Sequence, residues 1–267
     1  MSERLFHGIL AAPAPLGESM NNAEAQNMST IDNSLNPQFN AEPLRLEDLE
    51  NKIINADCMD ILKQLPDKCI DLVLTDPPYG IGCDGGNYGL GVKPKDFKKK
   101  NWDNEIPNKD VFDEIKRVSK NQIIFGGNYF TDYLKSTKSW IFWDKKGDLR
   151  VQNNFSDGEL IWTSFNNVTK KITYIQQGFL NQNKGENLDR IHPTQKPVDL
   201  IGHILRDYSK ESDLVLDCFS GSGTTAIACH RLNRRFICIE KDKEYWEASC
   251  KRLEDERKQL SLFGGVE

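Results

Sequence analysis

The sequence predicts an α/β fold in which most strands of a single sheet run parallel. From Leu44 onward, short runs rich in Ile, Val, Leu and Phe alternate with amphipathic helical stretches, a pattern typical of strand–helix–strand units. Glycine-containing or polar turns follow several of the apolar runs. The chain of 267 residues is long enough to bury one substantial core. We therefore expect one α/β domain.

The first elements of this domain lead to a pair of prolines. Residues 52–55 are predicted to form a strand, residues 59–65 a helix and residues 70–75 a second strand. This strand runs into Asp76-Pro77-Pro78-Tyr79. Two consecutive prolines fix two φ angles and remove two backbone donors, so we expect a rigid loop that presents carbonyl and carboxylate acceptors.

The middle of the chain continues the alternation. Residues 111–118 have helical spacing, and residues 122–125 form a predicted strand that ends at two glycines. The apolar runs at residues 139–143 and 160–163 are separated by a polar loop that contains Asn153 and Asn154. Two strands so close in sequence predict an antiparallel hairpin at one end of the sheet.

The last third repeats the strand–helix unit twice. We expect a strand at residues 214–216, a helix from Thr224 through His230, a strand at residues 236–239, and a long helix from about Lys243 to Arg257.

The N-terminal segment differs in composition from the rest. The first 50 residues carry eight acidic and two basic residues, whereas the whole chain has a net charge of −5. Residues 1–43 are rich in Asn, Ala, Ser and Pro without periodicity, so we expect a disordered tail before a domain at residues 44–267. The near-neutral domain leaves room for a local basic face that binds nucleic acid.

Cysteine usage and hydropathy indicate the compartment. Seven cysteines occur without a Cys-x-x-Cys pair, mostly in apolar runs, which favours buried thiols in a reducing environment. No stretch approaches a secretory signal or a membrane span. His203 and His230 have apolar helical neighbours and are interpreted as surface or core histidines, so no metal site is predicted. We expect a cytoplasmic protein.

The proline loop predicts chemistry on an amino group. An exocyclic amine of a nucleobase becomes nucleophilic when acceptors hold its two hydrogens and draw the nitrogen out of conjugation. The Asp76 carboxylate and the Pro77 carbonyl are suitable acceptors, and Tyr79 offers a ring on which a flipped-out base can stack. An ordinary strand exit with a buried tyrosine is the alternative.

A second motif predicts a nucleotide-like cofactor. Asp217-Cys218-Phe219-Ser220-Gly221-Ser222-Gly223-Thr224 joins a strand to a helix, and its two glycines let the backbone approach a ligand closely. The next strand ends at Glu240, where a carboxylate can receive the hydroxyls of a ribose. The spacing fits adenosine-containing cofactors and leaves a nicotinamide dinucleotide open, but it excludes a Walker phosphate loop.

Together these motifs resemble those of the S-adenosylmethionine-dependent DNA amino-methyltransferases of the β class, in which the catalytic motif precedes the cofactor motif. The segment His192-Pro193-Thr194-Gln195-Lys196-Pro197 is similar to the one that precedes the cofactor motif in this class. The resemblance extends from about Lys52 to Leu253. It implies a Rossmann-like methyltransferase sheet with a circularly permuted motif order, and S-adenosyl-L-methionine as cofactor.

The resemblance also implies the roles of individual residues. Asp76, Pro77, Pro78 and Tyr79 are the expected catalytic residues. The expected cofactor-binding residues are Asp57, Cys58, Lys196, Asp217, Phe219, Ser220, Gly221, Ser222, Gly223, Thr224 and Glu240. Two of them have an alternative, because Asp57 is equally suited to cap the helix that follows it and Lys196 to be an exposed lysine at a helix start.

Asp76 favours adenine N6 as the methylated atom, because the family tends to use serine at this position when cytosine N4 is the target. No Pro-Cys dipeptide is present, which argues against methylation of the cytosine ring carbon. A cytosine-N4 enzyme, an RNA or protein amide methyltransferase, and a catalytically idle DNA-binding module remain as alternatives.

Two regions are expected to meet double-stranded DNA, which would associate the protein with the nucleoid. A cluster of lysines after the catalytic loop is suited to phosphates, although a solvated charge run is the alternative; its members are Lys93, Lys95, Lys98, Lys99 and Lys100. Residues 144–190 lie where the β class carries its target-recognition region. This region is short, which leaves room for a homodimer in which a second subunit extends recognition.

Overall fold

The computed structural model describes residues 44–84, 97–149, 156–177, 180–182 and 190–263. All of them belong to one compact unit. The disordered tail predicted at residues 1–43, the polar-loop residues Asn153 and Asn154, and the DNA-binding role predicted for Lys93 and Lys95 lie outside the described residues.

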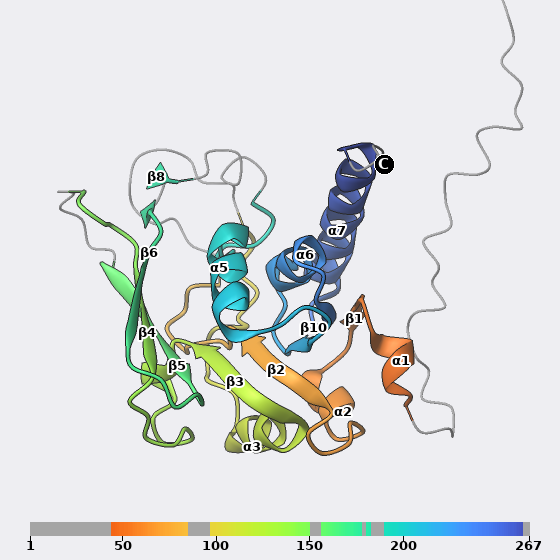
Figure 1. The fold of residues 1–267 in the computed structure, drawn as a ribbon, viewed down its shortest axis with the longest axis horizontal. Helices are drawn as coiled ribbons and strands as arrows, with labels where there is room; N and C mark the ends of the chain where they lie inside the picture. Colours follow the sequence, from red (N-terminus) through yellow and green to blue (C-terminus); the bar gives the residue numbers. More distant parts are fainter. Residues whose placement is uncertain (1–43, 85–96, 150–155, 178–179, 183–189, 264–267) are drawn as a thin grey trace, which may run out of the picture. The chain divides into compact units, whose positions relative to one another are not determined.

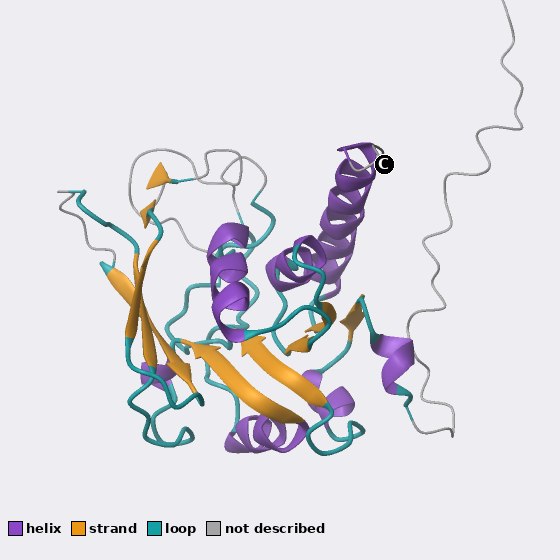
Figure 2. Ribbon diagram, in the orientation of Figure 1, coloured by secondary structure: helices purple, strands orange, loops and turns teal. Residues whose placement is uncertain are grey.

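An eight-stranded sheet forms the centre of this unit (Figures 1 and 2), with the strand order β1-β10-β9-β2-β3-β5-β4-β6. The strands are β1 (Lys52–Asn55), β2 (Ile70–Thr75), β3 (Ser119–Phe125), β4 (Trp140–Asp144), β5 (Gly158–Thr163), β6 (Lys170–Thr173), β9 (Leu214–Asp217) and β10 (Arg235–Glu240). The first five strands in this order, β1, β10, β9, β2 and β3, pair with one another in parallel. Strand β5 is antiparallel to both β3 and β4. The predicted mostly parallel α/β sheet is thus confirmed.

The predicted antiparallel pair is present as β4 and β5, but it is not the outermost part of the sheet. Strand β6 pairs in parallel with β4 and forms the edge. No sequence pattern predicts this strand, because only one residue of Lys170-Lys171-Ile172-Thr173 is buried and no apolar alternation marks it. A second, two-stranded sheet follows, formed by β7 (Gln176–Gln177) and β8 (Leu180–Asn181).

Helices cover both faces of the sheet (Figure 1). On one face lie α5 (Val198–Tyr208), α6 (Thr224–Arg231) and α7 (Lys243–Phe263), and on the other α1 (Leu46–Leu49), α2 (Cys58–Leu62) and α3 (Lys109–Val118). Central strands covered on both faces read as continuous apolar runs, and β2 shows this pattern. Its Leu72 and Leu74 belong to the core under α5 and α6, and its Val73 to the core under α2 and α3.

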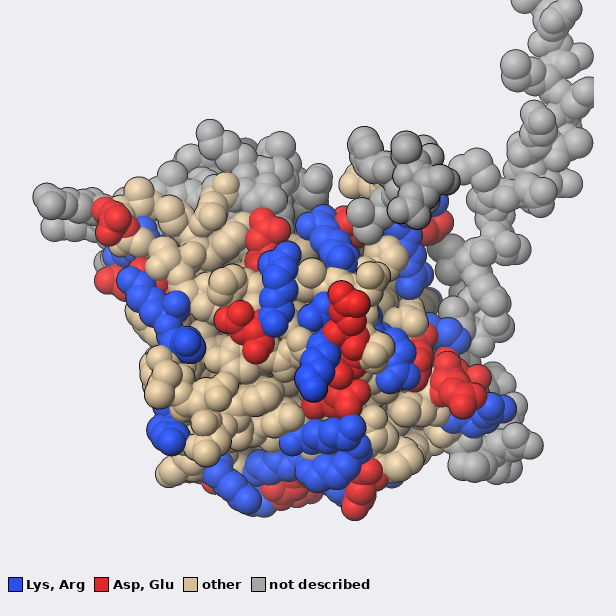
Figure 3. Space-filling view, in the orientation of Figure 1, with Lys and Arg blue, Asp and Glu red and all other residues tan. Residues whose placement is uncertain are grey.

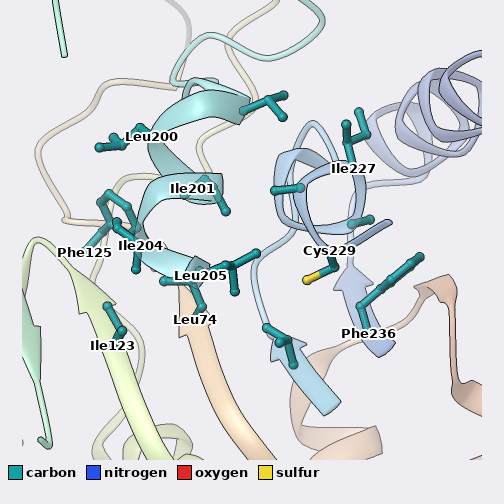
Figure 4. Packing of buried hydrophobic residues seen from close by; sticks show 14 of the residues in the cluster. Leu74, Ile123, Phe125, Leu200, Ile201, Ile204, Leu205, Ile227, Cys229 and Phe236 are labelled. Carbon is teal, nitrogen blue, oxygen red and sulfur yellow. The ribbon is translucent and has the colours of Figure 1, made fainter. Parts of the chain in front are cut away.

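The core beneath α5 and α6 is densely packed with branched and aromatic side chains (Figure 4). Ile201, Ile204 and Leu205 of α5 lie over Leu74 and Ile123 of the two central strands, and all five are at most 2% exposed. Burial of a side chain of this size contributes roughly 1.5–3 kcal/mol. This layer fixes α5, and with it the segment that enters α5 from the candidate site.

The topology brings two distant chain segments together. Strands β2 and β9 are neighbours, with Leu72 opposite Val215 and Val73 opposite Leu216. Because parallel strands end at the same edge, the loops after Thr75 and after Asp217 emerge side by side. The predicted catalytic and cofactor motifs therefore lie at one edge of the sheet.

The surface of the protein carries charges of both signs (Figure 3). Basic and acidic side chains are interspersed on the face of the protein drawn in Figure 3, and neither sign dominates it. Among the residues that the structure describes, no helix combines the length and the apolar character needed to cross a membrane.

Candidate active site

The two predicted motifs line one cavity of about 950 Å³. Asp76 and Tyr79 border it from the loop after β2, Gly221 from the loop after β9, and Glu240 from the end of β10. The segment before α5, which contains Lys196, contributes another wall. The structure thus brings the predicted catalytic and cofactor residues to a single site.

Asp217 orders the edge between the two motifs. Its Oδ1 accepts a hydrogen bond from Thr75 Oγ1 at 2.8 Å and another from the Phe219 backbone N–H at 3.1 Å. Its Oδ2 accepts from Thr225 Oγ1 at 2.6 Å. Burial raises the pKa of this carboxyl to about 6. Asp217 therefore joins the end of β2, the turn after β9 and the start of α6.

The glycine turn has the backbone that its sequence predicts. Gly221 and Gly223 have φ values of +50° and +72°, a region that side chains with a Cβ rarely adopt. A Cβ on Gly223 would also lie only 3.0 Å from the Cβ of Ser249. The turn leads into α6 at Thr224, whose hydroxyl donates to the Lys196 carbonyl at 3.1 Å. An open backbone at the start of a helix is suited to close contact with a polar ligand.

Glu240 faces the turn from the end of β10. Its Oε2 accepts from the Gly221 N–H and its Oε1 from the Asp242 N–H, both at 2.7 Å. Burial raises the pKa of this carboxyl to about 7. The carboxylate lies where the sequence predicts a ribose contact, and its bonds to the turn fix its orientation.

Asp57 caps helix α2, which is one of the two roles that the sequence predicts for it. Its Oδ1 accepts from the Met59 N–H at 2.9 Å, and its Oδ2 pairs with Lys241 at 2.8 Å. Asp57 and Cys58 both line the cavity. The capping role is confirmed, and contact with the cofactor adenine stays a prediction.

Asp76 lies in a network of partly buried charges. Its Oδ2 is 2.5 Å from Lys196 Nζ, and its Oδ1 accepts from the Tyr79 hydroxyl at 2.6 Å. The Tyr79 hydroxyl also contacts Glu159, which pairs with Lys145 at 2.7 Å and with Lys196 at 3.3 Å. The exposed alternative for Lys196 is wrong, because its side chain is only 12% exposed and its ammonium contacts two carboxylates.

The charges in this network shift one another. Burial raises the pKa of Asp76. The nearby Lys196 ammonium lowers this pKa, and the Glu159 carboxylate raises it. Burial also raises the pKa of Glu159, but the Lys196 and Lys145 ammonium groups outweigh this effect and hold the pKa of Glu159 at about 2. Burial opposes the charge on Lys196, yet the two carboxylates raise its pKa. Glu159 is therefore the more firmly ionised of the two acids.

Tyr79 has only part of its ring available. The ring stacks on Tyr129 with centroids 4.7 Å apart and an interplanar angle of 12°, and Phe130 meets its edge. Gly126, at φ +62°, makes this packing possible, because a Cβ there would lie 2.2 Å from the Tyr79 ring. Tyr129 thus occupies one face of the ring and the Lys196 ammonium lies 5.7 Å from its centroid, and the stacking of a flipped-out base on Tyr79 stays a prediction.

Asp103 holds the backbone of the catalytic loop. Its Oδ1 accepts from the N–H groups of Tyr79 at 2.7 Å and Gly80 at 2.9 Å, and its Oδ2 accepts from Cys83 N–H at 2.7 Å. The residue is 2% exposed. The two prolines remove their own donors, and Asp103 satisfies the next donors along the loop. No sequence motif predicts this role of Asp103.

Lys100 forms ion pairs with two acidic residues that follow β10. Its ammonium lies 2.7 Å from both Asp242 and Glu244 and 4.2 Å from the centroid of the Tyr245 ring. The predicted phosphate contact is not the role that Lys100 has in this structure, because both acids neutralise its charge. Lys98 and Lys99 are exposed, and their contact with DNA stays a prediction.

His192, from the segment that precedes the cofactor motif, is buried between aromatic rings. Its ring centroid lies 5.0 Å from that of Trp102 and 4.3 Å from that of Tyr245. Burial, with the nearby Lys196 charge, lowers its pKa to about 3, so the imidazole is neutral. In the described ranges of the chain, no three His, Cys, Asp or Glu side chains form a group suited to a metal ion.

The residues that line the cavity fit S-adenosylmethionine. The positive φ angles of Gly221 and Gly223 leave the backbone of the turn open, and Glu240 provides a buried carboxylate next to it. In the same cavity, the Asp76 carboxylate is placed to accept hydrogens. Acceptors for hydroxyl groups and for an amine thus share one cavity.

The chain is similar in sequence to known DNA methylases. A family model described as DNA methylase matches residues 128–251. The chain is 28% identical over 240 residues to the type II methyltransferase M.HpaI of Haemophilus parainfluenzae, covering 78% of this chain and 76% of that protein. It is 29% identical over 259 residues to M.HinfI of Haemophilus influenzae, another type II methyltransferase, covering 79% and 70%.

Solved structures agree with these relatives. The complex of M1.HpyAVI with S-adenosylmethionine has a TM-score of 0.51 and 25% identity, and the alignment covers 76% of this chain and 98% of that one. The cytosine-N4-specific PvuII DNA methyltransferase has a TM-score of 0.50 at 16% identity, covering 78% and 91%, and supports the fold alone.

Proposed function

We propose that this chain, which belongs to the DNA methylase family and is an S-adenosylmethionine-dependent DNA methyltransferase, methylates the N6 amine of adenine. The observation that carries the choice of an amine is the arrangement of acceptors at Asp76-Pro77-Pro78. The Asp76 carboxylate lines the cavity that also contains the glycine turn. An amine that enters the cavity would therefore meet acceptors beside the methyl donor.

The residues that would hold the cofactor follow the cavity wall. Asp57 and Cys58 would lie at the adenine, Glu240 at the ribose, and the turn from Asp217 to Thr224 along the rest of the cofactor. When bound, S-adenosylmethionine supplies an electrophilic methyl group on a positively charged sulfur. Lys196 is directed at Asp76, so its main role here is in the catalytic network.

The catalytic loop would activate the amine by holding its hydrogens. One hydrogen is donated to the Asp76 carboxylate and the other to the Pro77 carbonyl, which places the nitrogen lone pair toward the methyl carbon. Bound S-adenosylmethionine would supply the methyl group that this nitrogen takes. Alignment and stabilisation of the charge that moves to nitrogen supply the rate enhancement.

The preference for adenine rests on Asp76. The family tends to use serine there for cytosine N4, and this chain has aspartate, so we assign adenine N6 and keep cytosine N4 as the alternative. The open part of the Tyr79 ring would stack the flipped-out base.

Contact with double-stranded DNA would involve two parts of the chain. Lys98 and Lys99 would bind phosphates near the catalytic loop. Residues 144–190, which include β5 and β6, would recognise the target sequence, with a second subunit of a homodimer extending the contact. We would then expect the enzyme at the nucleoid in the cytoplasm.

Sequencing of single DNA molecules from a methylation-deficient host that expresses the protein tests this function. We expect N6-methyladenine at one short recurrent motif, and no modification in cells that express Asp76→Ala at the same level. N4-methylcytosine would overturn the choice of base. Methyl transfer to RNA or protein, with none to DNA, would overturn the proposed substrate.

A further inference from the structure

The Tyr79 hydroxyl has more carboxylate neighbours than it has hydrogens. It lies 2.6 Å from Asp76 Oδ1 and also within hydrogen-bond distance of Glu159 Oε1. A phenol hydroxyl carries one hydrogen and can donate to only one of these oxygens. The second contact becomes a hydrogen bond only when one carboxyl carries a proton. The three oxygens are thus arranged for a protonated acid.

The surroundings identify which acid takes the proton. Glu159 is 9% exposed, and the Lys145 and Lys196 ammonium groups both contact it. These two charges hold the pKa of Glu159 at about 2, whereas burial and the Glu159 charge raise that of Asp76. A proton at this site therefore resides on Asp76. The hydrogens then point in one direction, from Asp76 to Tyr79 and from Tyr79 to Glu159.

We propose that Glu159 is a positioning residue for methyl transfer, which acts through the Tyr79 hydroxyl to stabilise the proton that Asp76 takes from the methylated amine. The proposal rests on the proposed function, because it presumes that Asp76 binds the amine. It assigns a role in catalysis to a residue that no motif marks.

The step balances in atoms and charge. The amine nitrogen forms a bond to the methyl carbon, the carbon–sulfur bond breaks, and its electron pair stays on sulfur. One N–H proton passes to Asp76 Oδ1, and the Tyr79 hydrogen turns from Asp76 to Glu159. Asp76 loses its negative charge in the same step in which the positive charge leaves the cofactor. The total charge of the cavity is therefore unchanged, and Asp76 later releases its proton to solvent.

Lys145 explains why this network tolerates two carboxylates. The partly buried acids Asp76 and Glu159 are matched by the two ammonium groups of Lys145 and Lys196. Lys196 contacts both acids, whereas Lys145 contacts Glu159. Glu159 thus stays an acceptor for Tyr79 while Asp76 changes its protonation, which is the asymmetry that the proposed role requires.

The test is the single-turnover rate of methyl transfer to plasmid DNA from a methylation-deficient host, measured against pH for wild type and Glu159→Gln. Glutamine keeps an acceptor oxygen but removes the charge. We expect the plateau rate to fall about tenfold or more, because Asp76 becomes a weaker base. The acid limb of the profile should move to lower pH by about one unit, because the pKa of Asp76 falls when a neighbouring negative charge is lost.

Asp157→Asn is the matched control. It removes a negative charge two residues away, from a side chain that is 73% exposed and pairs with Lys146. This variant should keep the wild-type plateau and acid limb. A merely structural role for Glu159 would change the binding of S-adenosylmethionine in calorimetry but would not move the acid limb.

Tyr79→Phe completes a double-mutant cycle, because it keeps the ring and removes the hydroxyl. We expect the double variant to lose no more plateau rate than the worse single variant. Additive losses, or a wild-type plateau and acid limb in Glu159→Gln, would overturn the proposal. If Glu159→Gln fails to bind the cofactor, a wild-type plateau in Tyr79→Phe overturns it instead. Failure of the wild type to methylate DNA would overturn the proposed function itself.

Discussion

Lys196 Nζ lies 2.5 Å from Asp76 Oδ2, although 120 residues separate them in the sequence. The same lysine accepts a hydrogen bond through its carbonyl oxygen from Thr224, the first residue of α6. One residue therefore contacts the catalytic loop with its side chain and the cofactor turn with its backbone. The side chain and the backbone make separate contributions, and a substitution can separate them.

Lys196→Met should impair methyl transfer more than cofactor binding. Loss of the ammonium removes the main charge that favours ionised Asp76, so the pKa of Asp76 rises further. The acid limb of the single-turnover rate should therefore move to higher pH, opposite to the shift expected for Glu159→Gln. Lys63→Met, on an exposed lysine, is the control. An unmoved acid limb in Lys196→Met would contradict this role for Lys196.

Asp103→Ala should destabilise the catalytic loop. It would leave the N–H groups of Tyr79, Gly80 and Cys83 without their acceptor. These donors are only partly buried, and a fully buried unsatisfied donor costs roughly 1–3 kcal/mol, so the free energy of unfolding should fall by about 1–3 kcal/mol in total. Urea denaturation measures it, with exposed Asp132→Ala as control. Equal midpoints for the two variants would show that the three contacts contribute nothing.

Cofactor affinity should depend on the protonation of Glu240. Burial raises the pKa of this carboxyl to about 7, and ribose hydroxyls donate best to its ionised form. The affinity for S-adenosylmethionine should therefore increase between pH 6 and pH 8 and then level off. Titration calorimetry at several pH values measures this. Glu240→Gln should bind more weakly at pH 8 and lose this dependence, and a pH dependence retained by the variant would contradict the assignment.

Acid should weaken the attachment of the edge strand β6. Lys171 pairs with Asp144 at 2.8 Å and holds the pKa of that carboxyl at about 2, below its unfolded value of about 3.9. The stabilisation is present above about pH 4 and is lost as the pH falls through about 2. Asp144→Asn should therefore unfold more easily than wild type at pH 7, with a smaller difference near pH 2. Asp148→Asn is the exposed control. A difference that does not change with pH would rule out the ion pair.

Sequence patterns predicted the central strands because their signal is local. Strand β2 is buried along most of its length and reads as a continuous apolar run, and the turn at Gly221 is specified by its glycines. Strand β6 has no such signal, because its one buried residue, Ile172, lies among exposed neighbours. The elements that sequence reasoning missed are those whose stability comes from pairing with a partner strand.

Several contacts in the candidate site were not predicted from the sequence, for a different reason. Glu159 is a single charged residue in a strand, and it reaches Tyr79, 80 residues earlier, only because β5 pairs with β3. Asp103 contacts the loop 24 residues before it through bonds to backbone N–H groups, which leave no mark in the sequence. Lys196 was identified by its motif, but its partner Asp76 was not foreseen. Each of these contacts joins residues that are distant in the sequence, so no local pattern reveals it.

The adjacency of β2 and β9 has a consequence for biosynthesis. Thr75 and Asp217 meet across 142 positions of the chain, so their contact forms only after a long loop has closed. A ribosome that has synthesised the catalytic loop still has to complete β9, α6 and β10 before the cavity has its second wall. Contacts of such long range form slowly. A nascent chain therefore lacks the complete cavity until the residues through β10 have been synthesised and have folded.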